Sequence, residues 1–336
     1  MRSVIFLFVL SLVSGCAHTA VVKSWEPAEI DARGINRIAV VDFTGEKGSE
    51  IASALSARLW SNDFYTLVDH SEFSSEIQPA SYSDHQGIHG LLASASGAGV
   101  DAVIVGSVIQ FSCEDNVLSS TELDIRSYTD SESRESVAEN PLLIESQETL
   151  YREATVTIAF RLVDVETGEI LASKQISKHT QGEMKQGENS LPEKGRMLDQ
   201  LLTDCLDEIV HMLAPHEMAC EMELATCEFW TKGSSHVKEG SKLASKGRWD
   251  EAKFAWEKAL LKNPDNHAAL YNLSISAVRN QNYDAAEEYV LDALKCEHKG
   301  CYTAGLEKIR ERRSALSRAN EQREARVASS DDSLWQ

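Results

Sequence analysis

The strongest constraint on the fold is a repeat in the C-terminal third of the chain. Three positions recur 34 residues further on: Trp249, Ala252 and Ala259 return as Tyr283, Ala286 and Ala293. Self-similarity at a fixed period of about 20–50 residues is typical of stacked units that cannot bury their apolar faces alone. The alanines let helices approach closely, and the aromatic rings fill the gaps between them. We therefore expect an all-α region of paired helices.

The same region resembles the tetratricopeptide repeat family. The segment GRWDEA at 247–252, with Trp256, Ala259 and Pro264, fits the second half of that repeat, and Gly240 falls on its small-residue position. We predict two repeats over 233–300. A capping helix at 301–319 and a frayed tail at 320–336 are expected to follow.

The resemblance implies a peptide-binding groove on the concave face, which the first helix of each repeat lines. The side chains expected to face it are Tyr271, Asn272, Ile275 and Arg279. In this interpretation Asn272 and Arg279 clamp a carboxylate. The alternative is that Tyr271 and Ile275 pack on the preceding domain and that Asn272 is mere consensus.

The pattern of the N-terminal residues indicates an export signal. A basic start is followed by an apolar stretch from Val4 to Val13, too short to cross a bilayer as a helix, and then by Ser14 and Gly15 before Cys16. An ordinary secretory signal with an incidental cysteine would also fit.

The four residues VSGC at 13–16 resemble the lipobox of bacterial lipoproteins. The resemblance implies cleavage after the signal peptide at 1–15 and lipid attachment at Cys16, which anchors the chain durably. Ala17 stands where a retention signal would usually show Asp, so we expect the outer membrane, with the chain facing the periplasm. Residues 16–34 are expected to be the lipid anchor and a polar tether.

Composition narrows the class of partner. The 336 residues include 33 basic and 53 acidic ones, a formal net charge of −20. Such a surface repels phosphate backbones, so nucleic acid is a poor partner. The length suits two domains.

The cysteines permit disulfides in an exported chain. Cys296 and Cys301 flank a turn at Gly300 and are the expected local pair, whereas Cys220 and Cys227 can pair only if the chain bends between them. A zinc site at Cys296, His298 and Cys301 would lack a fourth ligand, so no metal is expected.

Residues 35–216 predict a mixed sheet with helices on its faces. Apolar runs at 37–43, 65–68 and 102–110 indicate buried strands, and alternation at 154–162 with a return segment at 169–178 indicates a hairpin. Amphipathic helices are expected at 49–62 and 197–213, and a short one through Leu91 and Leu92. Residues 217–232 are expected to connect this domain to the repeats.

Three pieces in register resemble the periplasmic domain of the curli secretion channel lipoproteins (CsgG-type): IAVVDF at 38–43, GVDAVIVG at 99–106 and RLVDVETGEI at 161–170. The fold class expected is therefore α/β (α+β), a CsgG-like domain with a mixed sheet flanked by helices, followed by the all-α repeats. Related lipoproteins activate peptidoglycan synthases or serve other envelope assemblies, so the fold does not decide the function.

In that family two hairpins build a shared membrane pore, and the matching regions here are 112–150 and 177–195. Val117, Leu123 and Ile125 share one face in the first region, but polar residues interrupt the row, and the second region has no such row. Strands that cross a membrane need about 9–11 residues with a continuous apolar face. We therefore expect 112–150 to be a solvated acidic insertion. It would be a disordered or partner-binding loop, or else a mobile loop without a function.

We find no catalytic constellation and expect no cofactor. His216 and Glu217 lack the second histidine of a zinc protease helix, and His85 and His89 flank Gly87 in what we expect to be a polar loop. A phosphate-binding loop and a Gly-x-Ser-x-Gly elbow are also missing from the sequence.

The leading hypothesis is a non-enzymatic, lipid-anchored periplasmic adaptor that binds a protein through its repeats. The first alternative is a subunit of an oligomeric CsgG-type outer-membrane secretion pore, assembled through the CsgG-like domain. The second alternative is an activator of a peptidoglycan synthase.

Overall fold

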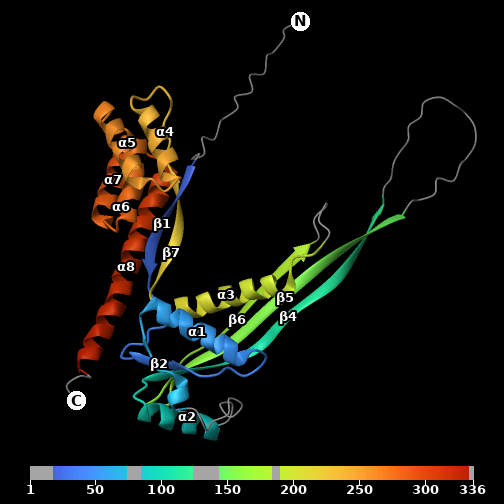
Figure 1. Ribbon diagram of the computed structural model, residues 1–336. Coiled ribbons are helices and arrows are strands. Elements are labelled where there is room, and N and C mark those ends of the chain that lie inside the picture. Colours follow the sequence, from blue (N-terminus) through green and yellow to red (C-terminus); the bar gives the residue numbers. More distant parts are fainter. Residues whose placement is uncertain (1–17, 74–84, 124–143, 184–189, 333–336) are drawn as a thin grey trace, which may run out of the picture. The chain divides into compact units, whose positions relative to one another are not determined.

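The computed structural model describes residues 18–73, 85–123, 144–183 and 190–332 (Figure 1). The chain divides into two compact units. The repeat unit contains the described residues up to Ala28 and Pro215–Glu324, and the α/β unit contains Glu29–Ala214 and the residues from Ala325. The predicted fold classes, a mixed sheet with helices and an all-α repeat region, are confirmed.

None of the described helices combines the length and the apolar character that a membrane span requires.

The α/β unit is built on a five-stranded mixed sheet in the order β3-β2-β4-β5-β6. Its strands are β2 (Arg37–Val40), β3 (Thr66–Leu67), β4 (Ala102–Leu123), β5 (Ile144–Asp164) and β6 (Ile170–Glu183). Strand β2 runs parallel to β3 and β4, whereas β4, β5 and β6 form an antiparallel meander, drawn side by side in Figure 1.

Helices cover both faces of this sheet. Helices α1 (Gly48–Asn62) and α3 (Lys194–Leu213) share one core with Ile104 of β4. Helix α2 (His85–Gly97) covers the other face and packs on Val103 and Val105. The alternation of neighbouring residues along β4 therefore supplies both cores, as a strand buried on both faces requires. A single 3₁₀ turn, η1 (His70–Glu72), follows β3.

The prediction of a solvated insertion at 112–150 is wrong at both ends. Strands β4 and β5 remain paired from Ser112↔Thr155 to Leu123↔Ile144, and β6 continues to Glu183 within the second region. Residues 124–143 lie outside the described residues. Ladder pairing satisfies the backbone groups of these polar segments, which an argument from composition alone neglects.

A cross-strand ion pair supports the extended strands. Arg152 Nη2 lies 2.9 Å from Asp115 Oδ2, and Lys194 at the start of α3 joins the same carboxylate at 3.4 Å. The hydrogen bond from Arg152 lowers the pKa of Asp115 to about 2. The carboxylate is therefore charged throughout the neutral range.

The repeat unit contains two helical hairpins and most of a long final helix, α8. Helices α4 (Ser234–Ala244) and α5 (Trp249–Lys262) form the first hairpin, α6 (His267–Arg279) and α7 (Tyr283–Cys296) form the second, and α8 spans Gly300–Asp332.

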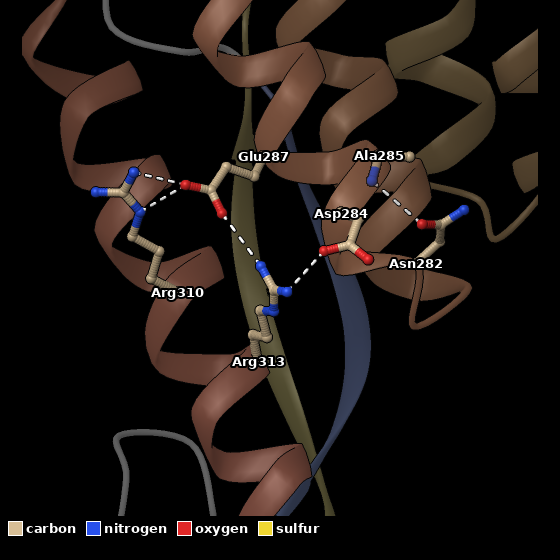
Figure 2. A network of polar contacts seen from close by, with 6 residues as sticks. All are labelled: Asn282, Asp284, Ala285, Glu287, Arg310 and Arg313. Atoms are coloured by element: carbon tan, nitrogen blue, oxygen red, sulfur yellow. Dashed lines mark hydrogen bonds and ion pairs between the residues drawn. The ribbon is translucent and has the colours of Figure 1, made fainter.

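Side-chain caps begin both helices of the second hairpin. Asn266 Oδ1 accepts a hydrogen bond from the Ala269 amide, and Asn282 Oδ1 accepts one from Ala285 (Figure 2).

Helix α8 is held on α7 by a polar network that Figure 2 shows. Arg310 Nε donates to Glu287 Oε1 at 2.8 Å, and Arg313 reaches Asp284 at 2.8 Å and the second oxygen of Glu287 at 3.5 Å. One carboxylate thus bridges two guanidinium groups of α8. Charge-assisted pairs of this kind are the stronger hydrogen bonds of a protein surface.

The predicted end of the capping helix at 319 is also wrong, since α8 continues to Asp332. Gln322 exchanges two hydrogen bonds with the backbone of Ala28, at 2.9 and 3.1 Å. The guanidinium of Arg323 lies 3.6 Å from the centre of the Trp25 ring. These contacts with the N-terminal segment continue the helix through residues where we expected a frayed tail.

About half of the tether expected at 16–34 and of the connector expected at 217–232 forms a two-stranded ribbon. Strand β1 (His18–Glu26) pairs antiparallel with β7 (His216–Leu224), and every residue of each strand has a partner. Ala20 and Val22 are buried while Thr19 and Val21 are exposed, which is the alternation of a half-buried strand.

Close packing between α4 and α5 leads to a first prediction. A Cβ added at Gly240 would lie 2.4 Å from Nε1 of the buried Trp256, whereas one added at Gly300 meets no atom within 4 Å. Overpacking of a core costs roughly 1–3 kcal/mol. We expect Gly240→Ala to lower the free energy of unfolding by that amount in urea titrations followed by circular dichroism. The control Gly300→Ala should leave it unchanged or slightly higher, and equal stability of the two variants would contradict the packing described.

Candidate functional site

The residues predicted to line a peptide groove lie mostly in the core of the repeat unit. Tyr271, Asn272 and Ile275 on α6 are buried, and Asn272 has no exposed surface. Arg279, at the end of α6, is exposed, and its guanidinium lies 5.8 Å from the centre of the Trp249 ring. Three of the four side chains therefore face this chain and not an open groove.

Asn272 uses its side-chain amide on the chain's own backbone. Its Oδ1 accepts from the Ala225 amide at 2.7 Å, and its Nδ2 donates to the Ala225 carbonyl at 3.0 Å and to Ser241 Oγ at 3.3 Å. Ala225 directly follows β7. The amide group satisfies both backbone groups of one residue, so this buried polar side chain leaves no donor or acceptor unpaired there.

Tyr271 and Ile275 pack on segments that approach α6 from elsewhere in the sequence. Tyr271 stacks on Tyr302 of α8, with ring centroids 4.5 Å apart. Ile275 shares a core with Val22 of β1 and Leu224 of β7. The apolar side chains of the ribbon thus cover the face of α6 that would otherwise be open to a peptide. The alternative that these residues pack on the preceding domain is also corrected, because β1 and β7 belong to the repeat unit.

A partly buried hydrogen-bonded network that the sequence analysis missed lies beside this core. The Tyr302 hydroxyl is 2.6 Å from His267 Nδ1, and His267 Nε2 is 2.6 Å from a Glu297 carboxylate oxygen. Burial, helped by Lys299, lowers the pKa of His267 against the attraction of Glu297. A hydroxyl, an imidazole and a carboxylate in series can activate a nucleophile, but Tyr302 has no exposed surface. These hydrogen-bonded side chains therefore link α6 to the start of α8. Nothing in the local sequence could have indicated it, because its members come from separate elements.

The predicted disulfide between Cys296 and Cys301 is not formed, and both cysteines are free thiols. Cys296 is exposed at the end of α7, whereas Cys301 packs against the core of the repeat unit. The two side chains thus lie in different environments. Cys220 and Cys227 are free as well.

The remaining predicted residues contribute no metal site. Among the described residues no cluster of His, Cys, Asp or Glu could hold a metal ion. His85 and His89 lie on α2, not in a loop. The signal segment 1–15 and Cys16 lie outside the described residues.

The α/β unit presents a second candidate surface at the edge of its sheet. Strand β6 is the last strand in the order, and no described strand pairs with its outer side. Most of its 14 residues are exposed, including Ile170 and Leu171. A long open edge is a template on which another strand can pair. The sequence predicted the hairpin partner of β5, but nothing in it showed that this strand would end the sheet.

Comparison with known families identifies both parts of the chain. The model of the family "Curli production assembly/transport component CsgG" matches residues 35–222, and a tetratricopeptide repeat model matches residues 237–297. The first match covers more than half of the chain, and the chain belongs to the CsgG family. Both are scaffold or transport families. No curated protein matches the chain.

Several solved structures are similar in part. The PelC dodecamer from Paraburkholderia phytofirmans is 13% identical, covers 57% of this chain and 96% of its own, and has a TM-score of 0.28. Lipoprotein GNA1162 from Neisseria meningitidis is 16% identical over 52% of this chain and 98% of its own, with a TM-score of 0.29. The LpoB C-terminal domain from Salmonella enterica is 15% identical over 45% and 87%, with a TM-score of 0.25.

The contacts of Asn272 lead to a second prediction. Asn272→Ala leaves the buried amide and carbonyl of Ala225 without their partner, which costs roughly 1–3 kcal/mol for an unsatisfied group. We expect the urea midpoint of the repeat unit to fall by a corresponding amount. Asn280→Ala, at the exposed end of the same helix, should leave it unchanged. An Asn272→Ala protein of full stability would show that the amide has some other task.

The thiols provide a third prediction. Burial raises the pKa of Cys205 to about 11, so only about one molecule in a thousand carries the thiolate at pH 8. Iodoacetamide should therefore modify the exposed Cys296 of the native protein without reductant and leave Cys205 untouched until the protein is unfolded. Peptide mass spectrometry measures both sites. A Cys296 that reacts only after reduction would restore the predicted disulfide.

Proposed function

We propose that the chain is a non-enzymatic, lipid-anchored scaffold on the periplasmic face of the outer membrane. In this proposal the repeat unit carries the anchor and the α/β unit binds other protein chains. The observation that carries it is the pairing of β1 with β7, which ties the segment next to Cys16 into the core of the repeat unit.

The anchor and the repeat unit are joined by very little chain. Strand β1 begins at His18, two residues after Cys16. Two residues span at most about 7 Å. A lipid on Cys16 would therefore hold the repeat unit at the membrane surface, without the long tether that the sequence suggested.

The filled concave face moves the partner site away from the repeats. Asn272 is hydrogen-bonded to the residue that follows β7, and Ile275 packs in one core with both strands of the ribbon. A peptide could therefore bind here only by displacing the ribbon. The open edge of β6 offers main-chain groups over a long strand instead. We propose that a second copy of this chain, or a strand of another envelope protein, pairs there.

A pore subunit is the second candidate, favoured by the length of β4 and β5, which have 22 and 21 residues. The described part of their extension carries charge on both faces, however. Asp115 and Arg152 pair on one face, while Asn116 donates to Glu153 on the other at 3.2 Å. Charged side chains are costly in contact with lipid, and this favours the scaffold.

The proposal is tested by cell fractionation and by cross-linking. We expect the full chain in the outer-membrane fraction with a lipid mass on Cys16, and the Cys16→Ala variant in the soluble periplasmic fraction. A photo-activated cross-linker in place of the exposed Gln175 on β6 should give covalent adducts with protein, and one in place of the exposed Ser61 on α1 should not.

Three outcomes would count against parts of the proposal. Equal membrane retention of Cys16→Ala would contradict the anchor. A monomer in mild detergent, without adducts from position 175, would contradict assembly through β6. Ion conductance through vesicles that contain the purified protein would favour the pore.

A further inference from the structure

The repeat unit exposes two adjacent aromatic side chains on the loop that follows β7. Phe229 is 84% exposed and Trp230 is 72% exposed. Their ring centroids lie 4.8 Å apart in an edge-to-face arrangement. We refer to Phe229 and Trp230 as the aromatic pair. Large exposed apolar groups that lie together indicate an interaction surface, whereas single ones are common and need no explanation.

The loop that carries the aromatic pair is tied to the repeats at several points. Asn272 holds Ala225 at its start. The Phe229 carbonyl accepts from Ser234 Oγ at 2.9 Å, and the Lys232 carbonyl accepts from Asn266 Nδ2 at 3.2 Å. Both ends of the loop are therefore bonded to helices, and the rings are presented to solvent by an ordered backbone.

The register of the ribbon places the beginning of this loop beside the start of β1. His18, the first residue of β1, pairs with Leu224, the last residue of β7. Strand β1 therefore leaves from the end at which β7 arrives, and the loop begins directly beyond that end. Cys16 precedes His18 by two residues, at most about 7 Å of chain. The aromatic pair thus lies on the side of the repeat unit to which the lipid would be attached.

A third exposed apolar residue lies at the same end. Leu261, in the last turn of α5, is 84% exposed. This turn adjoins the loop, because a Cβ added at Gly233 would lie 2.8 Å from the Ala259 carbonyl oxygen. The loop and the adjoining last turn of α5 therefore both expose apolar side chains.

Exposed charges of both signs accompany these apolar groups. Lys232 of the loop and Lys262 at the end of α5 are exposed, as are Glu228, Asp265 and Glu223 near the end of β7. The lysines can keep their ammonium groups in water while their stems lie along apolar surface.

We propose that the aromatic pair, with Leu261, inserts into the interfacial layer of the membrane that holds the lipid anchor. Tryptophan is enriched at this depth because its ring is apolar while its N–H stays hydrated. Stable anchoring of a peripheral protein commonly combines a lipid with a second contact. The inserted rings would be that second contact and would fix the orientation of the repeat unit on the bilayer. The inference rests on the proposed lipidation of Cys16.

The test uses the lipidated full-length protein in vesicles of phosphatidylethanolamine with a minor share of phosphatidylglycerol. Some of the lipids carry bromine on the upper part of their acyl chains, which quenches nearby tryptophan fluorescence. We expect quenching of the wild-type protein and loss of most of it in Trp230→Phe. The matched control is Trp25→Phe. Trp25 lies seven residues further along β1, about 24 Å from its start at roughly 3.4 Å per residue, so this variant should keep the quenching.

Two readouts separate this inference from the proposal on which it rests. Intact mass is measured first, and a protein without the lipid mass shows that the anchor has failed. With the lipid mass present, equal quenching of wild type and Trp230→Phe overturns the insertion and leaves the anchor in place. If the pair instead binds a second copy, the lipidated wild type shows no quenching at Trp230, while Trp230→Ser lowers the molar mass in detergent; this result also overturns the inference.

Discussion

The pairing of β1 with β7 is the interaction on which the rest of the structure depends. The two strands are separated in sequence by the whole α/β unit up to Ala214, so their ladder closes a very long loop. The ribbon fills the concave face of the repeats, and its end positions Ala225 to bond with Asn272. The same ribbon positions Trp25 and Ala28 in contact with α8. The α/β unit is consequently an insertion between two strands of the repeat unit.

The α/β unit is stabilised by its own contacts. Helices α1 and α3 are joined by an ion pair of 2.9 Å between Arg58 and Asp207, and the buried Tyr65 hydroxyl donates to the Leu213 carbonyl at 2.8 Å. Burial raises the pKa of Tyr65, so its hydroxyl stays protonated and remains a donor. The sheet beneath these helices has one well-covered region, on which both helices pack, and a long polar extension.

Both functional ideas follow from the ribbon. Because β1 begins two residues after Cys16, the anchor that we propose would be carried by the repeat unit, and because the ribbon covers α6, we propose the partner site on the sheet of the α/β unit. In this proposal the expected roles of the two parts are exchanged. Tetratricopeptide repeats that serve as an anchoring base need no open groove, which agrees with the burial of Tyr271 and Ile275.

The sequence by itself determined the local elements and the two families. The period of 34 residues and the strand and helix patterns of 35–216 record which faces must be buried, and local pattern carries that information. Only the tertiary structure decided what covers those faces. The alternation of buried Ala20 and Val22 with exposed neighbours was present in the sequence of β1. Its partner strand β7, however, follows the α/β unit in the chain. Neither strand's own sequence indicates which distant strand it pairs with. The same holds for Asn272, whose residue type fits the repeat consensus while its hydrogen bonds depend on where Ala225 returns.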